Sequence, residues 1–141
     1  IENLPIADNT ANIIISNCVI NLSPDKERVF QEAYGILKPA GRLMVSDIVR
    51  LSALPDALKD SIQAYVSSIA GAVRKDDYLG AIEKADFQGV KIMDETLFPV
   101  KDVIDYPAVQ ETVTDLGITK DMVDQFSAAV SSIKVYAVKP S

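Results

Sequence analysis

The stretch Asn12-Ile13-Ile14-Ile15-Ser16-Asn17 carries the fold prediction for the whole chain. Its β-branched run is typical of a strand that is buried on both faces of a parallel sheet. A second apolar run follows at residues 42–49, and a helical pattern lies between the two runs. A strand, a helix and a strand joined by short connections predict a βαβ unit with parallel strands and a right-handed crossover.

The helix between these strands is expected to begin at Ser23 and to end before Gly41. Ser23 is a favourable N-cap residue, and Pro24 suits the first helical position because no N–H donor is needed there. The apolar positions of one helical face are Val29, Phe30, Ala33 and Leu37. Pro39 cannot continue the helix, and Gly41 is predicted to take a positive φ at its end.

The rest of the chain extends this pattern. It predicts helices at 55–73 and 76–85, a strand within 87–97, a partial helix within 98–116, a helix from Thr119 to Val130, and a last strand at 133–138. The order β-α-β-α-α-β-α-α-β predicts a single α/β domain with helices on both faces of its sheet. We expect a βαβ core at 1–50, a helical, substrate-side region at 51–130, and the last strand at 131–139.

The composition excludes several classes of function. The chain has 141 residues, a formal charge of -6 and no histidine, so nucleic-acid binding, histidine metal sites and Ser-His-Asp triads are not expected. Cys18 is the only cysteine, which rules out an intrachain disulfide and fits a reducing compartment. The apolar runs are too short for a membrane span. We therefore expect a cytoplasmic protein that binds neither nucleic acid nor a membrane.

The predicted order is that of the later half of a doubly wound, Rossmann-like sheet. Such sheets consist of two βαβαβ halves, and a glycine-rich turn in the first half cradles the cofactor. The chain has no glycine-rich turn between a strand and a helix, and it opens at Ile1 rather than at methionine. We therefore expect it to be the C-terminal fragment of a longer protein.

Three segments resemble class I S-adenosylmethionine (SAM) methyltransferases, and the arsenite methyltransferase family in particular. They are residues 1–5 (IENLP), 14–26 (IISNCVINLSPDK) and 37–43 (LKPAGRL). The last of them is common to many methyltransferases, whereas SNCVINLSPDK is far more specific. The resemblance covers about the first 95 residues and the closing strand, and it implies a mixed sheet with an antiparallel last strand.

The resemblance also implies functional residues. Ile1 and Glu2 would contact the adenine of SAM, and Asn17, Cys18 and Val19 would border its methionine end. Cys18 would bind the acceptor, because trivalent arsenic is soft and prefers thiolates. The parent protein would then transfer a methyl group from SAM to arsenite, while the isolated fragment would be inactive.

One departure bears on the acceptor. The family has a second arsenic-binding cysteine where this chain has Ser68, and serine is a poor ligand for arsenic. Two further differences, Asn12 for an aspartate and Ala40 for a glycine, fall at structural positions. A methyltransferase with a small organic acceptor, similar to the quinone-biosynthesis enzymes, is therefore the alternative.

Simpler interpretations stand beside these roles. Cys18 can be a small buried apolar residue and Glu2 a frayed terminal charge. Asp47 can line the site or serve a turn or cap, while Tyr65 and Tyr78 are typical core residues with a solvated hydroxyl.

Two other classes remain open at this level. One is a non-catalytic binding or dimerisation module derived from a methyltransferase, and the other is an unrelated α/β domain such as a response-regulator-like or hydrolase fragment. The segment SNCVINLSPDK argues strongly against the second of them. The exposed sheet edge of a fragment would favour a homodimer.

Overall fold

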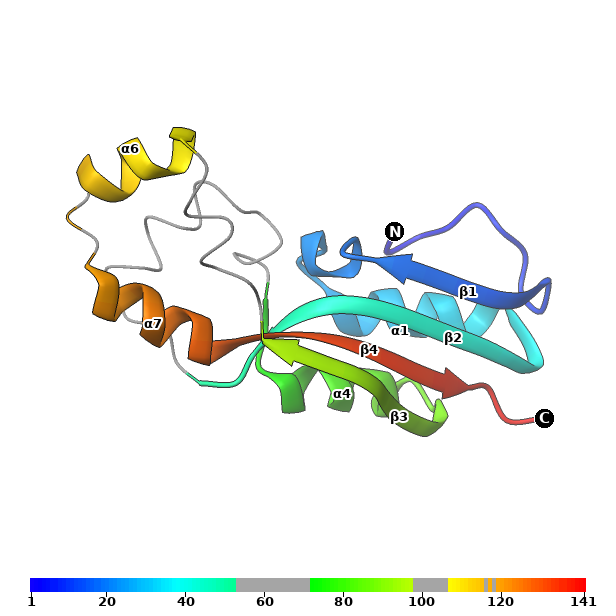
Figure 1. Cartoon of the computed structure of the whole chain (residues 1–141). Coiled ribbons are helices and arrows are strands. Elements are labelled where there is room, and N and C mark those ends of the chain that lie inside the picture. Colours follow the sequence, from blue (N-terminus) through cyan, green and yellow to red (C-terminus); the bar gives the residue numbers. More distant parts are fainter. Residues whose placement is uncertain (53–71, 98–106, 116, 118) are drawn as a thin grey trace.

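The computed structural model describes residues 1–52, 72–97, 107–115, 117 and 119–141 (Figure 1). The elements are β1 (Ala11–Asn17), the 3-10 turn η1 (Ile20–Leu22), α1 (Lys26–Ile36), β2 (Leu37–Arg50), α4 (Lys75–Lys84), β3 (Gln88–Leu97), α6 (Pro107–Asp115), α7 (Lys120–Ala129) and β4 (Val130–Val138). The helix predicted at 55–73, with Tyr65 and Ser68, lies outside the described residues. No described helix is long and apolar enough to cross a membrane.

The four described strands form one mixed sheet in the order β1-β2-β4-β3. β1 pairs with β2 in parallel, which confirms the predicted βαβ unit. β4 pairs antiparallel with both β2 and β3, so the last strand of the chain lies inside the sheet (Figure 1). The predicted antiparallel last strand is therefore confirmed.

One face of this sheet carries the core of the described residues. α1 and α4 both pack against it, since their buried side chains join one cluster with those of β2 and β4. The members that come from these four elements are Val29, Phe30, Ala33, Leu37, Leu43, Val45, Val49, Tyr78, Ala81, Ile82, Ile133, Val135 and Ala137. The second helical layer, predicted for the opposite face, stays a prediction.

The expectation that β1 is buried on both faces is wrong for the described structure. Ile14 packs against the core, but Ile13 is 42% exposed and Ile15 is 75% exposed. Successive side chains of a strand point to opposite faces, and neither α1 nor α4 lies on the face of Ile13 and Ile15. The isoleucine run therefore has one buried member and two exposed ones.

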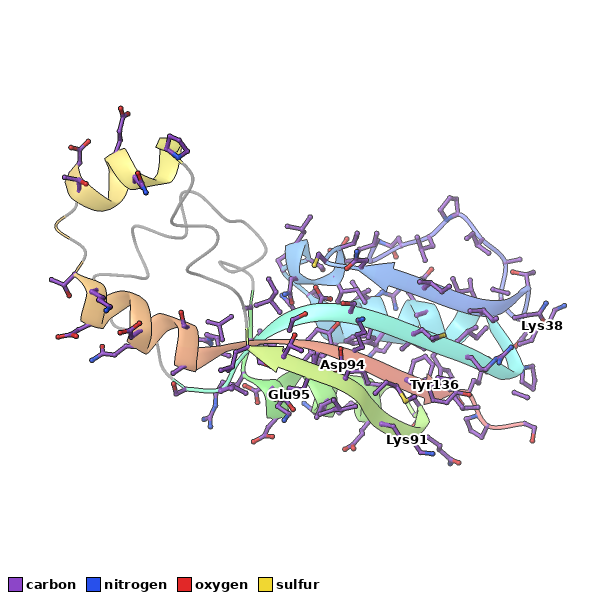
Figure 2. The ribbon with its side chains drawn as sticks, viewed as in Figure 1. Lys38, Lys91, Asp94, Glu95 and Tyr136 are labelled. Atoms are coloured by element: carbon purple, nitrogen blue, oxygen red, sulfur yellow. The ribbon has the colours of Figure 1, made fainter. Side chains whose placement is uncertain are left out.

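The two outer strands of the described sheet differ in chemistry. β3 carries Lys91, Asp94 and Glu95, which lie along this edge in Figure 2. Charged side chains on an edge strand oppose pairing with another chain, whereas the exposed isoleucines of β1 do not. The predicted homodimer through β1 stays a prediction, and a monomeric sedimentation coefficient at high concentration would contradict it.

The start of α1 differs from the sequence prediction. The N-cap is Asp25, whose carboxylate accepts a hydrogen bond from the backbone N–H of Arg28 at 3.0 Å. The Ser23 hydroxyl instead accepts the Asp25 N–H at 3.1 Å and donates to the Glu2 carboxylate. Ser23 therefore forms a short turn before the helix, and the helix begins after Pro24 rather than with it.

The end of α1 also differs from its prediction. α1 ends at Ile36, and the buried Leu37 opens β2 instead of closing the helix. The positive φ falls on Ala40, at 66°, and Gly41 is needed for a different reason. A Cβ on Gly41 would lie 2.7 Å from the backbone oxygen of Lys38 and 2.9 Å from Cδ2 of Leu37.

Gly41→Ala is expected to lower the free energy of unfolding by about 2 kcal/mol, because the added methyl group overpacks a rigid backbone contact. Ala40→Gly is the matched change in the neighbouring residue. This change is expected to raise the free energy of unfolding, because it relieves a left-handed conformation that costs alanine about 1–2 kcal/mol. The greater freedom of glycine in the unfolded state offsets roughly 0.5–1 kcal/mol of this gain. Urea denaturation tests both changes, and an unaltered midpoint for Gly41→Ala would contradict the steric argument.

Lys139 fastens the end of β4 to the junction between α1 and β2. Its ammonium group donates to the carbonyl oxygens of Tyr34 at 2.9 Å and Leu37 at 2.8 Å, and to Asn9 Oδ1 at 3.0 Å. It also lies 4.7 Å from the centroid of the Tyr34 ring. A cation in this position stabilises the carbonyls that a helix leaves unpaired at its C-terminus.

Candidate functional site

The candidate site lies at the carboxyl ends of the parallel strands β1 and β2. Asn17, the last residue of β1, is in register with Ser46 of β2. The N-terminal end of the chain lies at this same end of the sheet (Figure 1). Ligands of open α/β sheets bind outside the carboxyl ends of the strands, so this end is the expected location of a site.

Cys18 forms a strained turn directly after β1. Its φ is 57°, a left-handed conformation that costs a residue other than glycine about 1–2 kcal/mol. Its N–H donates to the Ser46 carbonyl at 2.8 Å, and the chain continues into η1. The thiol is partly buried, while the neighbouring Asn17 and Val19 are exposed. Backbone strain of this kind occurs preferentially at functional positions.

Glu2 comes to the same end of the sheet. Its carboxylate accepts a hydrogen bond from the hydroxyl of Ser23, which follows η1. The hydrogen bond from Ser23, followed by a backbone hydrogen bond, lowers the pKa of Glu2. The Glu2 carbonyl also accepts Arg28 Nε at 3.1 Å. Glu2 is therefore held in place rather than frayed, and its carboxylate keeps lone pairs for a further donor.

Asp47 and Tyr78 form a buried pair that the sequence did not predict. The Tyr78 hydroxyl donates to Asp47 Oδ2 at 2.7 Å, and both side chains are almost fully buried. The expected core position of the Tyr78 ring is confirmed, but its hydroxyl is not solvated. Asp47 neither lines an open surface nor caps a helix. The sequence feature that could have indicated this pair is a lone carboxylate within the apolar run at 42–49, because a buried carboxylate requires a polar partner.

Charge and burial act together on this cluster. Burial raises the pKa of the Asp47 carboxyl, and the hydrogen bonds from Tyr78 and the Asn21 backbone and the charge of Lys26 offset it only in part. Burial, and after it the negative charge of Asp47, raises the pKa of the Cys18 thiol. Cys18 is therefore a protonated thiol at neutral pH, and a ligand that binds its sulfur must displace a proton.

The pH dependence of Cys18 alkylation follows from these shifts. The thiolate is the reactive form, so the rate is expected to rise with pH around a midpoint above about 8.5, the value of a free cysteine. Asp47→Asn removes the negative charge and should move the midpoint to lower pH. Peptide-resolved mass spectrometry after reaction with iodoacetamide measures both profiles, and an unchanged midpoint in Asp47→Asn would contradict the charge effect.

Cys18 is the only thiol in the sequence, and the structure describes it. Across the described ranges, no three His, Cys, Asp or Glu side chains come together as a metal site would require. Ser68 lies outside these ranges, so its position relative to Cys18 is not described. The predicted ligand and cofactor roles of Ile1, Glu2, Asn17, Cys18 and Val19 stay predictions.

A family model described as a methyltransferase domain matches residues 1–88, which include β1, α1, β2, α4 and the candidate site. The chain belongs to the SAM-dependent methyltransferase family. The predicted class I fold is confirmed, because solved methyltransferases share its architecture over almost the whole chain.

Arsenite methyltransferases are among the similar members of this methyltransferase family. The chain is 40% identical to that of Halobacterium salinarum over 92 residues, which are 65% of this chain and 24% of that protein. It is 34% identical to that of Aquipseudomonas alcaligenes over 102 residues, 72% of this chain and 30% of that protein. The predicted resemblance is confirmed, and this chain spans 24% and 30% of the length of these two relatives.

The structural comparison extends further along the chain. An arsenic(III) SAM methyltransferase from Chlamydomonas reinhardtii superposes with a TM-score of 0.69 and 27% identity over 96% of this chain and 40% of that chain. The likeness therefore extends past Gln88, the last residue that the family model matches, into β3 and β4.

Proposed function

We propose that this chain forms part of a SAM-dependent methyltransferase whose acceptor is trivalent arsenic. The observation that carries the proposal is Cys18, a lone thiol held in a strained turn at the carboxyl end of β1. Trivalent arsenic prefers thiolate ligands, and the related proteins above are arsenite methyltransferases. A thiol at this position would hold arsenic beside the end of SAM that carries the methyl group.

The residues at this end of the sheet fit a SAM molecule. Ile1 and Val19 are 43% and 44% exposed and offer apolar surface, and Glu2 offers a fixed carboxylate. In our proposal Ile1 covers a face of the adenine ring, Glu2 accepts its exocyclic amine, and Asn17, Cys18 and Val19 border the methionine portion. When bound, SAM supplies an electrophilic methyl group.

The contribution of the protein is mainly positioning. Methyl transfer requires an acceptor lone pair in line with the methyl group and the exclusion of water, and it needs little acid–base help. Cys18 would lose its proton on binding arsenic and would then fix the acceptor. The absence of histidine from the sequence is compatible with this chemistry.

The decisive experiment uses the protein as its gene encodes it. Incubation with methyl-labelled SAM, arsenite and excess thiol is expected to yield labelled methylarsenic species, separated by chromatography. Binding of SAM without methylated arsenic would overturn arsenite as the acceptor. Neither binding nor product would overturn the whole proposal. The 141 residues alone are expected to show no turnover, because the sequence contains no glycine-rich cofactor turn.

A small organic acceptor is the second candidate. It is favoured by Ser68, which stands where the arsenite family has a second thiol, and by the raised pKa of Cys18, which disfavours the thiolate that arsenic needs. In this case Cys18→Ala would keep most of the activity, since the cysteine would serve only as a packing residue.

A further inference from the structure

The Asp47–Tyr78 pair is a polar contact inside the described core that the proposed role of Cys18 does not use directly. Asp47 is 1% exposed and Tyr78 is 0% exposed, and the two come from β2 and α4. A buried carboxylate is costly, and a buried ion pair can often be replaced by well-packed apolar residues without loss of stability. The pair therefore suggests a purpose other than stability.

Asp47 lies between the two residues that hold the turn after β1. The carbonyl of Ser46 accepts the Cys18 N–H at 2.8 Å, and the carbonyl of Ile48 accepts Asn21 Nδ2 at 2.7 Å. The Asp47 carboxylate itself accepts a hydrogen bond from the backbone of Asn21. Three successive residues of β2 thus bind the turn at both of its ends.

Tyr78 completes this arrangement from the helical side. Its hydroxyl holds the Asp47 carboxylate at 2.7 Å, and its ring packs edge-on against Phe30 of α1 at a centroid distance of 5.5 Å. Lys26 Nζ donates to the carbonyls of Asn21 and Ser23 at 3.3 and 3.0 Å and adds a positive charge to the same cluster. The turn is therefore fixed from β2, α1 and α4.

The conformation of Cys18 explains why such fixation is needed. A cysteine with a φ of 57° is strained, so a change to an extended or right-handed conformation would lower its local free energy. The same change would redirect its side chain. Hydrogen bonds from rigid elements oppose that relaxation. Active-site geometry depends on supports of this kind, because small displacements of a reacting group lower rates strongly.

We propose that Asp47 and Tyr78 are a positioning pair that locks the Cys18 turn in the orientation required to present its thiol to the methyl acceptor. The inference rests on the proposed function for the acceptor, but the locking of the turn is a property of the chain itself. It predicts that removal of the Tyr78 hydroxyl, which belongs to α4 and not to the turn, changes the reactivity of Cys18.

Tyr78→Phe tests the lock with little change in volume. In the protein as its gene encodes it, alkylation of Cys18 by iodoacetamide is expected to be about fivefold faster than in the wild type, the factor that corresponds to one lost hydrogen bond. Asp47→Asn provides a second variant if Tyr78→Phe does not fold. Because this change also removes the negative charge that raises the pKa of the Cys18 thiol, its alkylation rate is compared with that of the wild type at a pH above both midpoints, where the thiol is ionised in both proteins. Peptide-resolved mass spectrometry follows the Cys18 peptide, so other cysteines do not interfere.

Ile82→Val is the matched control. It lies on the same helix, is fully buried and has no part in the hydrogen bonds of the turn. It loses a methylene of core packing, so it reports the effect of destabilisation alone. We expect its Cys18 alkylation to stay within twofold of the wild type. Equal alkylation rates in Tyr78→Phe, Ile82→Val and the wild type would overturn the inference.

Kinetics separate this inference from the proposed function. For arsenite methylation, Tyr78→Phe should lower kcat about fivefold and leave the KM for SAM unchanged, whereas Ile82→Val should leave both unchanged. Faster alkylation with an unchanged kcat would overturn the positioning role. A wild type that does not methylate arsenite refutes that acceptor, while the alkylation rates, measured without substrate, still decide whether the pair locks the turn.

Discussion

Cys18→Ser is expected to lower kcat/KM for arsenite by at least about 100-fold and to leave the affinity for SAM unchanged. A hydroxyl is a hard ligand that does not replace a thiolate on trivalent arsenic, and an acceptor that is not held in line with the methyl group reacts at least about 100-fold more slowly. The two side chains have nearly the same shape, so the turn after β1 should be preserved. Radiolabel transfer and isothermal titration with SAM measure the two quantities.

Cys18→Gly and Cys18→Ala provide the controls for this result. Both lack the thiol and should be as inactive with arsenite as the serine variant. Because glycine adopts a φ of 57° without strain, Cys18→Gly should unfold at a higher urea concentration than Cys18→Ala, by about 1 kcal/mol in the free energy of unfolding. If Cys18→Ser keeps more than a third of the wild-type activity, the cysteine does not hold the acceptor.

Phe30→Ala is expected to lower the free energy of unfolding by about 4 kcal/mol. Phe30 is fully buried on α1, and its ring meets that of Tyr78 edge-on, with an interplanar angle of 85°. The truncation would leave a cavity at the contact between α1 and α4, beneath the sheet. A loss of this size is a large share of the 5–15 kcal/mol that stabilises an ordinary domain. Urea denaturation followed by circular dichroism measures it.

Ile15→Ala is the contrasting control for Phe30→Ala. Ile15 lies in the run that decided the fold prediction, but it is 75% exposed on the face opposite the two helices. In this chain of 141 residues its truncation should change the free energy of unfolding by less than about 0.5 kcal/mol. Similar losses in the two variants would contradict the assignment of the core to one face of the sheet.

The sequence predicted the order of the elements well, because periodicity and turn residues act over short distances. The parallel pairing of β1 with β2 followed from this order, and so did the helical pattern between them. The exposure of Ile13 and Ile15 did not follow from it. A β-branched run indicates a strand, but which of its faces is covered depends on the helices that pack there.

The errors at the two ends of α1 have local causes. Ser23 and Asp25 are both good capping residues, and the choice between them depends on Glu2, which engages the Ser23 hydroxyl from 21 residues away. At the other end, the left-handed position falls on Ala40, and Gly41 is required by its close approach to Lys38. Sequence patterns do not contain such contacts, so cap positions stayed uncertain by about two residues.

The site was predicted only in part. The position of Cys18 at the end of a strand followed from local pattern, and the structure places it there. The contact between Asp47 and Tyr78 joins residues 31 apart on separate elements, so it requires the folded sheet. A carboxylate inside an apolar run was the one available sign of a polar partner in the core.

The central place of β4 in the sheet has a consequence for the timing of folding. β4 lies between β2 and β3, yet the ribosome makes it after both of them. Until Val130–Val138 has emerged, β2 has no neighbour on one side and β3 has no strand to pair with among the described strands. Ile133, Val135 and Ala137 are then missing from the core beneath α1 and α4. Before β4 is made, the apolar side chains of β2 that β4 will cover remain exposed in the growing chain. The chain is therefore most susceptible to aggregation and proteolysis just before β4 is complete.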